Sequence, residues 1–412
     1  MSLARAECEA RDARDPLAFV RARFAVPEKL IYLDGNSLGA VPVSVKDRLA
    51  RLIVQEWGED LITSWNKHDW IGMPQRLGAR VAPLIGAQAG EVIVADSTSV
   101  NLFKLAAGAV RLNAPRRVIL TERSNFPTDL YVLQGLDDLL GGAIELRMVE
   151  RSELARALNA DVALLMLTHT DFKTGAIHDM RALNAAAHKA GALTLWDLSH
   201  SAGAMEMFLD RDETDLAIGC GYKYLNGGPG APAYLYVAKR HQVDLRQPLN
   251  GWMGHAAPFD FGERYRPADG MLRHLCGTQA VLSMAALEEG LKTFDGVDMA
   301  AAREKSKALG DLFLQLVEER CGGFAFDIAC PRDGAKRGSQ ISLRHKDGYA
   351  IMRALIANGV IGDFRAPDFI RFGFAPLYNR YVEIWDAVDR LATIMKEDIW
   401  QEARFQSRLS VT

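Results

Sequence analysis

The chain contains 412 residues, of which 49% are hydrophobic and 25% are charged, so it can bury a large core. Single hydrophobic cores stop growing at roughly 250–300 residues, which predicts one large domain and one smaller domain. The formal net charge of −3 excludes the strong basic excess of a nucleic-acid-binding protein. The five cysteines are scattered without a C-x-x-C pair, which argues against a disulfide framework or a zinc site and favours a reducing compartment.

The N-terminal segment MSLARAECEARDARDPLAF mixes both signs of charge and lacks the apolar stretch of a secretory signal. The longest apolar runs, such as residues 162–167, have the length of a strand and are far too short to span a bilayer. We therefore expect a soluble, cytoplasmic protein that binds neither membranes nor nucleic acid.

Short apolar runs alternate with helical patterns between about residues 90 and 240. Strands are predicted at residues 91–95, 117–121, 143–149, 161–168, 192–197, 215–220 and 231–238. Helices are predicted between them, at residues 100–109, 129–139 and 177–190. This alternation predicts an α/β domain with a mostly parallel sheet that is covered by helices on both faces.

The last third of the chain predicts a smaller α+β domain. Helical patterns cover residues 280–320, 347–358 and 380–404, and strands are predicted at residues 339–344 and 369–374. We therefore expect a large domain over residues 51–280 and a small domain over residues 281–412. The first 50 residues are expected to pack on the small domain or on a partner subunit.

Three polar segments follow predicted strands of the large domain. The segment STSVN at 97–101 follows one strand and opens a helix, Asp197 ends a second strand, and Lys223 follows a third. Ligands of doubly wound sheets bind beyond the carboxyl ends of the strands. The sequence therefore predicts that these segments meet at a small-molecule site on one edge of the sheet.

These residue types match the needs of pyridoxal phosphate (PLP). The Lys223 amine can bind the cofactor aldehyde, and the Asp197 carboxylate can keep the pyridine nitrogen protonated. The hydroxyls of Ser97 and Thr98, at a predicted helix N-terminus, suit the phosphate. Tyr222 adds a phenol that can bind the phosphate or pass a proton. Each residue alone also fits a helix cap, a turn or a solvated side chain, so the interpretation depends on the combination.

Ordered motifs along nearly the whole chain carry a family resemblance. They are YLDGNSLG at 32–39, STSVN at 97–101, FPTD at 126–129, THTDFKTG at 168–175, WDLSHSAGA at 196–204, GYKYLNGGPGAPAYLYV at 221–237, GWMGH at 251–255, CGTQ at 276–279, RGSQISLRH at 337–345 and IRFGFAPLYNR at 370–380. Together they resemble the kynureninases, which are fold type I PLP-dependent enzymes of the class V aminotransferase group. The resemblance implies the transferase-like fold of that group, with a large PLP-binding domain and a smaller C-terminal α+β domain.

The resemblance also implies roles for single residues around the cofactor. Lys223 would bear the PLP, Asp197 would pair with the pyridine nitrogen, and Phe126 would stack on the ring. The other residues implied to line the cofactor are Ser97, Thr98, Asp129, Thr168, His200 and Tyr222. Without the motifs, Phe126 fits an ordinary core aromatic and His200 a structural histidine.

In this family the pocket lies at a homodimer interface, and Trp252 and Thr278 match the positions that arrive from the partner subunit. Arg371 matches the arginine that binds the substrate carboxylate, a task that suits its planar fork of donors. Asn36, Ser37 and His255 match or neighbour segments that line the substrate site. On pattern alone, Trp252 also fits a buried loop anchor and Arg371 a structural ion-pair partner.

The activity implied by the resemblance is the PLP-dependent hydrolysis of the Cβ–Cγ bond of L-kynurenine to anthranilate and L-alanine. The sequence leaves open whether 3-hydroxykynurenine is preferred, and whether the role is tryptophan catabolism or NAD biosynthesis. One alternative is another class V activity, either an aminotransferase or a cysteine desulfurase. A desulfurase needs a reactive thiol, for which Cys330 would be the candidate. A second alternative is a PLP-binding protein without catalysis.

Overall fold

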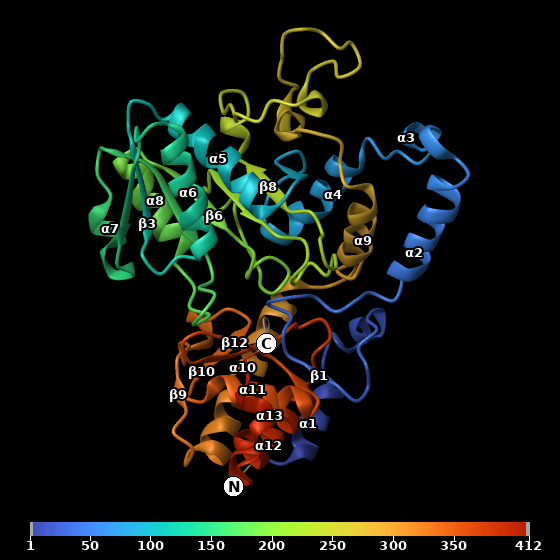
Figure 1. Cartoon of the computed structure of the whole chain (residues 1–412), viewed down its shortest axis with the longest axis vertical. Coiled ribbons are helices and arrows are strands. Elements are labelled where there is room, and N and C mark those ends of the chain that lie inside the picture. Colours follow the sequence, from blue (N-terminus) through green and yellow to red (C-terminus); the bar gives the residue numbers. More distant parts are fainter. Residues whose placement is uncertain (1–2, 409–412) are drawn as a thin grey trace.

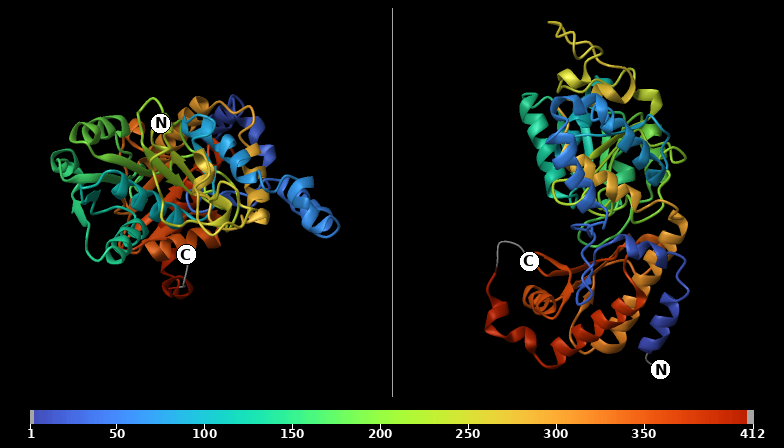
Figure 2. Two further views of the ribbon diagram at one scale, coloured as in Figure 1. Left: turned by 90° about the horizontal axis from the view of Figure 1, so that it is seen from above. Right: turned by 90° about the vertical axis from the view of Figure 1, so that its right-hand side faces the viewer.

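The computed structural model describes residues 3–408 and shows two lobes along the long axis of the molecule (Figure 1). The large lobe contains a seven-stranded sheet and the small lobe a four-stranded sheet. Helices α1 and α13, from opposite ends of the chain, both belong to the small lobe (Figures 1 and 2). Within the described residues, no helix has both the length and the apolar character needed to cross a membrane.

The large lobe confirms the predicted α/β architecture. Its sheet has the order β2-β8-β7-β6-β5-β3-β4, and β8 runs antiparallel to both of its neighbours while the other neighbouring pairs are parallel. The strands are β2 (Val92–Val94), β3 (Val118–Glu122), β4 (Glu145–Val149), β5 (Val162–Thr168), β6 (Leu193–Asp197), β7 (Leu216–Gly219) and β8 (Tyr234–Val237). Each of them lies within, or within one residue of, a predicted strand.

Alternate side chains of the strands enter two separate cores, one on each face of the sheet. Leu164 and Met166 of β5 pack with residues of α5 and α6, whereas Leu165 and Leu167 pack with residues of α8. Burial on both faces explains why the strands read as nearly continuous apolar runs. The helices of this lobe are α2 (Val45–Arg51), α3 (Ser64–Lys67), α4 (Met73–Val81), α5 (Thr98–Leu112), α6 (Pro127–Leu139), α7 (Leu154–Ala157), α8 (Met180–Ala190) and α9 (Val281–Lys292).

The small lobe is an antiparallel sheet packed with helices, and the N-terminal segment joins it. The sheet has the order β12-β13-β10-β9, α1 packs on α12, and β1 pairs in parallel with β11. The strands are β1 (Ile31–Tyr32), β9 (Asp327–Ile328), β10 (Gln340–Arg344), β11 (Val360–Ile361), β12 (Asp363–Arg365) and β13 (Phe369–Gly373). The helices are α1 (Arg5–Asp12), α10 (Met299–Cys321), α11 (Gly348–Ala357), α12 (Tyr381–Lys396) and α13 (Ala403–Gln406).

The helical pattern predicted over residues 280–320 is interrupted in the structure. Gly296 has a φ of +72°, and the Asp298 carboxylate accepts a hydrogen bond from the Ala300 amide at 2.9 Å, so α10 starts afresh with its own cap. Helix α9 packs on α2 and α4, and its Met284 and Leu287 belong to the core of the large lobe. We therefore propose that the small domain begins near α10 rather than at residue 281.

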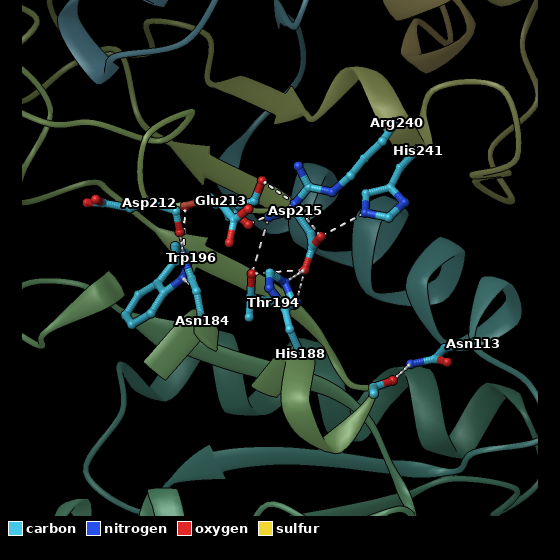
Figure 3. Close-up of polar contacts among 12 residues, drawn as sticks. Asn113, Asn184, His188, Thr194, Trp196, Asp212, Glu213, Asp215, Arg240 and His241 are labelled. Carbon is cyan, nitrogen blue, oxygen red and sulfur yellow. Dashed lines mark hydrogen bonds and ion pairs between the residues drawn. The ribbon is translucent and has the colours of Figure 1, made fainter. Parts of the chain in front are cut away.

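The buried carboxylate of Asp215, directly before β7, holds the start of this strand through several polar contacts (Figure 3). Asp215 accepts hydrogen bonds from the Thr194 amide at 2.8 Å and from Arg240 at 2.6 Å. Its oxygens also lie 2.8 Å from Nε2 of His188 and 2.7 Å from Nε2 of His241. This network joins α8, β6 and the turn after β8 at the end of β7 that is opposite to the candidate site.

Candidate active site

A cavity of about 290 Å³ lies at the carboxyl edge of the seven-stranded sheet. It is formed where the chain leaves β5, β6 and β7 and where α5 and α6 begin. The structure brings together here the predicted large-domain residues Ser97, Thr98, Phe126, Asp129, Thr168, Asp197, His200, Tyr222 and Lys223. Three strand ends and two helix starts therefore converge on one pocket, as the predicted topology requires.

The Lys223 amine contacts a histidine from the neighbouring strand loop. Its Nζ lies 2.9 Å from Nε2 of His200. Burial, together with the charge of Lys223, holds the pKa of His200 well below its ordinary value, so the imidazole is neutral. A neutral Nε2 can accept a hydrogen bond from the lysine, which places the amine above the end of the sheet.

Asp197 ends β6 inside the same cavity. Its side chain is buried, and Oδ1 accepts a hydrogen bond from the Ser199 amide at 2.8 Å. Burial raises the pKa of Asp197, while the hydrogen bond from Ser199 and the charge of Lys223 oppose the shift. A buried carboxylate of this kind is stabilised by a cationic partner, such as a protonated ring nitrogen.

A second acid lies beside Asp197. The Thr168 hydroxyl oxygen lies 2.6 Å from Oδ1 of Asn125 and 3.1 Å from Oδ2 of Asp129. Burial, reinforced by the charge of Asp197, raises the pKa of Asp129 well above its ordinary value. The Thr168 hydroxyl is therefore shared between Asp129 and Asn125, a residue that was not predicted from the sequence.

The cavity fits a phosphorylated cofactor. Ser97 caps α5, a helix of 15 residues, and its Oγ accepts a hydrogen bond from the Val100 amide at 3.3 Å. The following Thr98 and Ser99 line the cavity, so the first turn can present amides and hydroxyls to an anion. Ser199 Oγ and His200 Nδ1 are buried without a hydrogen-bond partner among residues 3–408. Polar atoms in this state favour a polar ligand.

Two aromatic rings form one wall of the cavity. The ring of Phe126 is 36% exposed and meets the ring of Phe172 edge to face, with centroids 5.1 Å apart. Phe126 was predicted as a stacking residue, and its exposed face is available to a planar ligand. Phe172 was missed, although it stands within the motif THTDFKTG.

The predicted substrate residues of the small lobe cluster behind Phe172. Arg371 is 2% exposed, and its Nη1 donates to the carbonyl oxygen of Phe172. Its Nε and Nη2 donate to the carboxylate of Asp363, with Nε at 2.6 Å from Oδ1. Ser37 donates to the same carboxylate at 2.9 Å, and Asn36 lies in the adjoining segment. The structure therefore joins Arg371 to the cavity through Phe172 and reveals Asp363, which the sequence analysis missed.

Trp252 and His255 do not line the cavity that contains Lys223. Trp252 is 39% exposed and packs edge to face against Phe259 in the long loop between β8 and α9. His255 is held in the same loop, where its Nδ1 accepts a hydrogen bond from the Ala257 amide at 2.9 Å. Thr278 is exposed and lines a neighbouring cavity of about 580 Å³ that shares Ser97 and Tyr222 with the first one.

Comparison with known proteins identifies relatives along the whole chain. A kynureninase from Pseudomonas fluorescens is 51% identical over 413 residues, which is 99% of each chain. The chain belongs to the kynureninase family. A kynureninase from Burkholderia pseudomallei (strain 1106a) is 50% identical with the same coverage, and the profile of the "Kynureninase C-terminal domain" matches residues 302–391.

Solved structures share the fold of this family member. A cysteine desulfurase from Thermococcus onnurineus NA1 superimposes with a TM-score of 0.77 at 19% identity and covers 92% of this chain and 98% of its own. A C-DES variant with glycine covalently linked to its PLP cofactor gives a TM-score of 0.77 at 18% identity, covering 90% and 98%. At these identities the likeness confirms the fold type I architecture.

Neither Cys330 nor Cys220 suits the nucleophile of a desulfurase in this family member. Cys330 is 6% exposed, lies outside the cavity, and has a pKa raised by burial. Cys220 lines the cavity, but burial raises its pKa as well. A nucleophilic thiol needs a lowered pKa and access to substrate, and neither cysteine combines the two.

Proposed function

We propose that the protein is a PLP-dependent hydrolase that cleaves the Cβ–Cγ bond of L-kynurenine with water, giving anthranilate and L-alanine. 3-Hydroxykynurenine, cleaved in the same way to 3-hydroxyanthranilate, is the second candidate substrate. The observation that carries the proposal is the meeting of Lys223, Asp197 and His200 in one cavity of a chain that belongs to the kynureninase family.

The chain's own residues would hold the cofactor. Lys223 would bind the PLP aldehyde, Asp197 would face the pyridine nitrogen, and Phe126 would cover one face of the ring. The N-terminus of α5 and Tyr222 would bind the phosphate. When bound, PLP supplies an electron sink for negative charge at the substrate α-carbon.

Other residues would move protons and orient the substrate. Arg371 would bind the substrate carboxylate, and the Lys223 amine would take the proton from the α-carbon. Water then adds to the γ-carbonyl carbon, and the Cβ–Cγ bond breaks to release anthranilate. Burial raises the pKa of Tyr222, so its phenol stays protonated and can donate the proton that completes L-alanine.

We further propose a cytoplasmic homodimer in which Trp252 and Thr278 of one subunit complete the site of the other. The exposure of both residues, and the absence of Trp252 from the lining of the cavity that contains Lys223, support this arrangement. Mixing Lys223→Ala with Trp252→Ala subunits tests it. If Trp252 completes the site of the other subunit, a hybrid dimer contains one site with both Lys223 and Trp252 intact, and activity returns. If each site uses only residues of its own subunit, both sites of the hybrid lack one residue, and no activity returns.

The function is tested by adding L-kynurenine to the PLP-loaded protein and following anthranilate fluorescence. Lys223→Ala should lose both turnover and the visible absorbance of the bound cofactor, whereas Lys189→Ala, at an exposed position of α8, should lose neither. Turnover by the Lys223 variant would refute the lysine assignment. Sulfide release from cysteine without anthranilate would indicate a desulfurase, and PLP binding without product would indicate a non-catalytic protein.

A further inference from the structure

Asp363 is the centre of a charged cluster behind the cavity. It is 4% exposed and accepts hydrogen bonds from Arg371 and from the Ser37 hydroxyl at 2.9 Å. It also forms an ion pair with Nη2 of Arg365 at 2.7 Å. Despite its burial, contact with Arg371 and Arg365 lowers the pKa of Asp363, so it stays ionised. A buried carboxylate with this many donors can hold a guanidinium in one orientation.

The sheet register explains why these side chains meet. Asp363 of β12 and Arg371 of β13 are directly opposite partners in an antiparallel pair, so their side chains leave the same face. Arg365 follows Asp363 by two positions and therefore emerges on that face as well. The geometry is thus built into the ladder, and a shift of one residue would separate the groups.

The donors of Arg371 divide into two sets. Nε and one Nη2 hydrogen point to the Asp363 carboxylate, which occupies one edge of the fork. The opposite edge meets neutral acceptors, the Phe172 carbonyl at Nη1 and the Ser37 hydroxyl 3.5 Å from Nη2. Phe172 lines the cavity, so this second edge is the one next to the substrate space.

We propose that Asp363 is a positioning residue that aims the Nη1–Nη2 edge of Arg371 at the substrate carboxylate. The Phe172 carbonyl accepts a hydrogen bond from Nη1, and the substrate carboxylate would take the place of this neutral acceptor. The inference rests on the proposed function, because it concerns how that site recognises an α-carboxylate. It predicts that Asp363 affects ligands with a carboxylate and spares those without one.

The test compares Asp363→Asn with Asp368→Asn in the PLP-loaded enzyme. Asp368 lies in the turn between β12 and β13 and binds Arg344 of β10 at 2.7 Å. Because that arginine is 46% exposed, Asp368 is a matched control for an aspartate paired with an arginine. Asp363→Asn should raise KM for L-kynurenine about tenfold or more with a smaller change in kcat, since one charge-assisted hydrogen bond typically accounts for roughly that factor. Asp368→Asn should change neither constant.

Binding readouts separate positioning from a general structural defect. L-Alanine, followed by the change in cofactor absorbance, should bind Asp363→Asn more weakly by the same factor. Kynuramine, the decarboxylated analogue of kynurenine, should inhibit the variant and the wild type equally. Equal loss for kynuramine, or a KM within twofold of wild type, would overturn the proposal. Asp363→Glu, which displaces the carboxylate by one methylene, should show the same split and serves if Asp363→Asn does not fold.

The two proposals fail in different ways. If the wild type forms no anthranilate, the proposed function is wrong, and the L-alanine titration still reports on Asp363. If the wild type is active and Asp363→Asn binds L-alanine normally, the positioning role alone is wrong. In an Arg371→Lys background, Asp363→Asn should add no further loss of affinity, because the fork that it positions is absent.

Discussion

Replacing Asp215 by Asn is expected to destabilise the large lobe from the side of the sheet opposite the cavity. The carboxylate is 2% exposed and accepts a hydrogen bond from the Thr194 amide (Figure 3). It also contacts the side chains of His188, Arg240 and His241. Removing one partner of a buried charged cluster costs about 3–5 kcal/mol. Because Arg240 and His188 are 47% and 31% exposed, solvent screens part of the interaction, and we expect about 3 kcal/mol.

The pH dependence of this loss has a definite sign. Despite burial, the contacts with His188 and His241 lower the pKa of Asp215. The contribution of Asp215 to the free energy of unfolding is therefore fully present above the unfolded pKa of 3.8. It is lost as the pH falls through the folded pKa. The hydrogen bond to Asp215 raises the pKa of His188, so that contribution is complete below 6.5 and is lost as the pH rises through the folded pKa. The difference in the free energy of unfolding between wild type and variant should therefore be largest between pH 3.8 and pH 6.5.

Urea denaturation followed by circular dichroism, repeated from pH 4 to pH 9, measures the effect. Asp295→Asn is the control, because that carboxylate is 61% exposed in its pair with Arg80 and should matter little. A difference between Asp215→Asn and wild type below about 0.5 kcal/mol at pH 5.5, or a gap that widens steadily above pH 7, would refute this account of the network.

Two further predictions concern the motif YLDGNSLG. Burial, with a contribution from the Asp363 carboxylate, raises the pKa of Asp34 to about 7, so the native state keeps a proton that the unfolded state releases near 3.8. The free energy of unfolding should therefore fall from pH 4 to pH 7 in wild type but not in Asp34→Asn, and an equal fall in both would contradict this assignment. Gly39→Ala should abolish PLP binding, measured by cofactor absorbance, because the new Cβ would lie 2.3 Å from the Lys223 carbonyl oxygen. The control Gly135→Ala meets no atom within 4 Å in α6 and should stabilise the helix by up to about 1 kcal/mol; unchanged cofactor binding in the Gly39 variant would contradict the steric argument.

The strands and one side of the candidate site were predictable because their signals are local. A parallel strand buried on both faces must be apolar throughout, so β5 and β6 are visible as runs of letters. Chain direction in such a sheet then places Asp197 and Lys223 at one edge without any knowledge of distances. The same reasoning brought Ser97 to that edge, and the structure places all three in one cavity.

The parts that escaped prediction depend on contacts between distant segments. Asp363 is a single acid in a short strand, and its importance comes from the register of β12 with β13, which periodicity does not reveal. Phe172 reads as a loop aromatic, and its carbonyl becomes an acceptor for Arg371, 199 residues away, only when the lobes come together. The break between α9 and α10 was missed because one glycine in a long helical pattern is usually tolerated.

The two lobes contribute different parts of the proposed chemistry. The large lobe holds Lys223 and Asp197 on a rigid sheet edge, whereas the small lobe holds the pair of Arg371 and Asp363 within one β-ladder. The contact between Arg371 and the Phe172 carbonyl crosses from one lobe to the other. A rotation between the lobes would therefore break this contact while leaving Arg371 paired with Asp363. A substrate whose carboxylate replaces the Phe172 carbonyl at Nη1 would be held by Arg371 of the small lobe. The same substrate would be held by the large lobe through the cofactor on Lys223. Recognition of the amino acid and alignment of the two lobes would therefore be a single event.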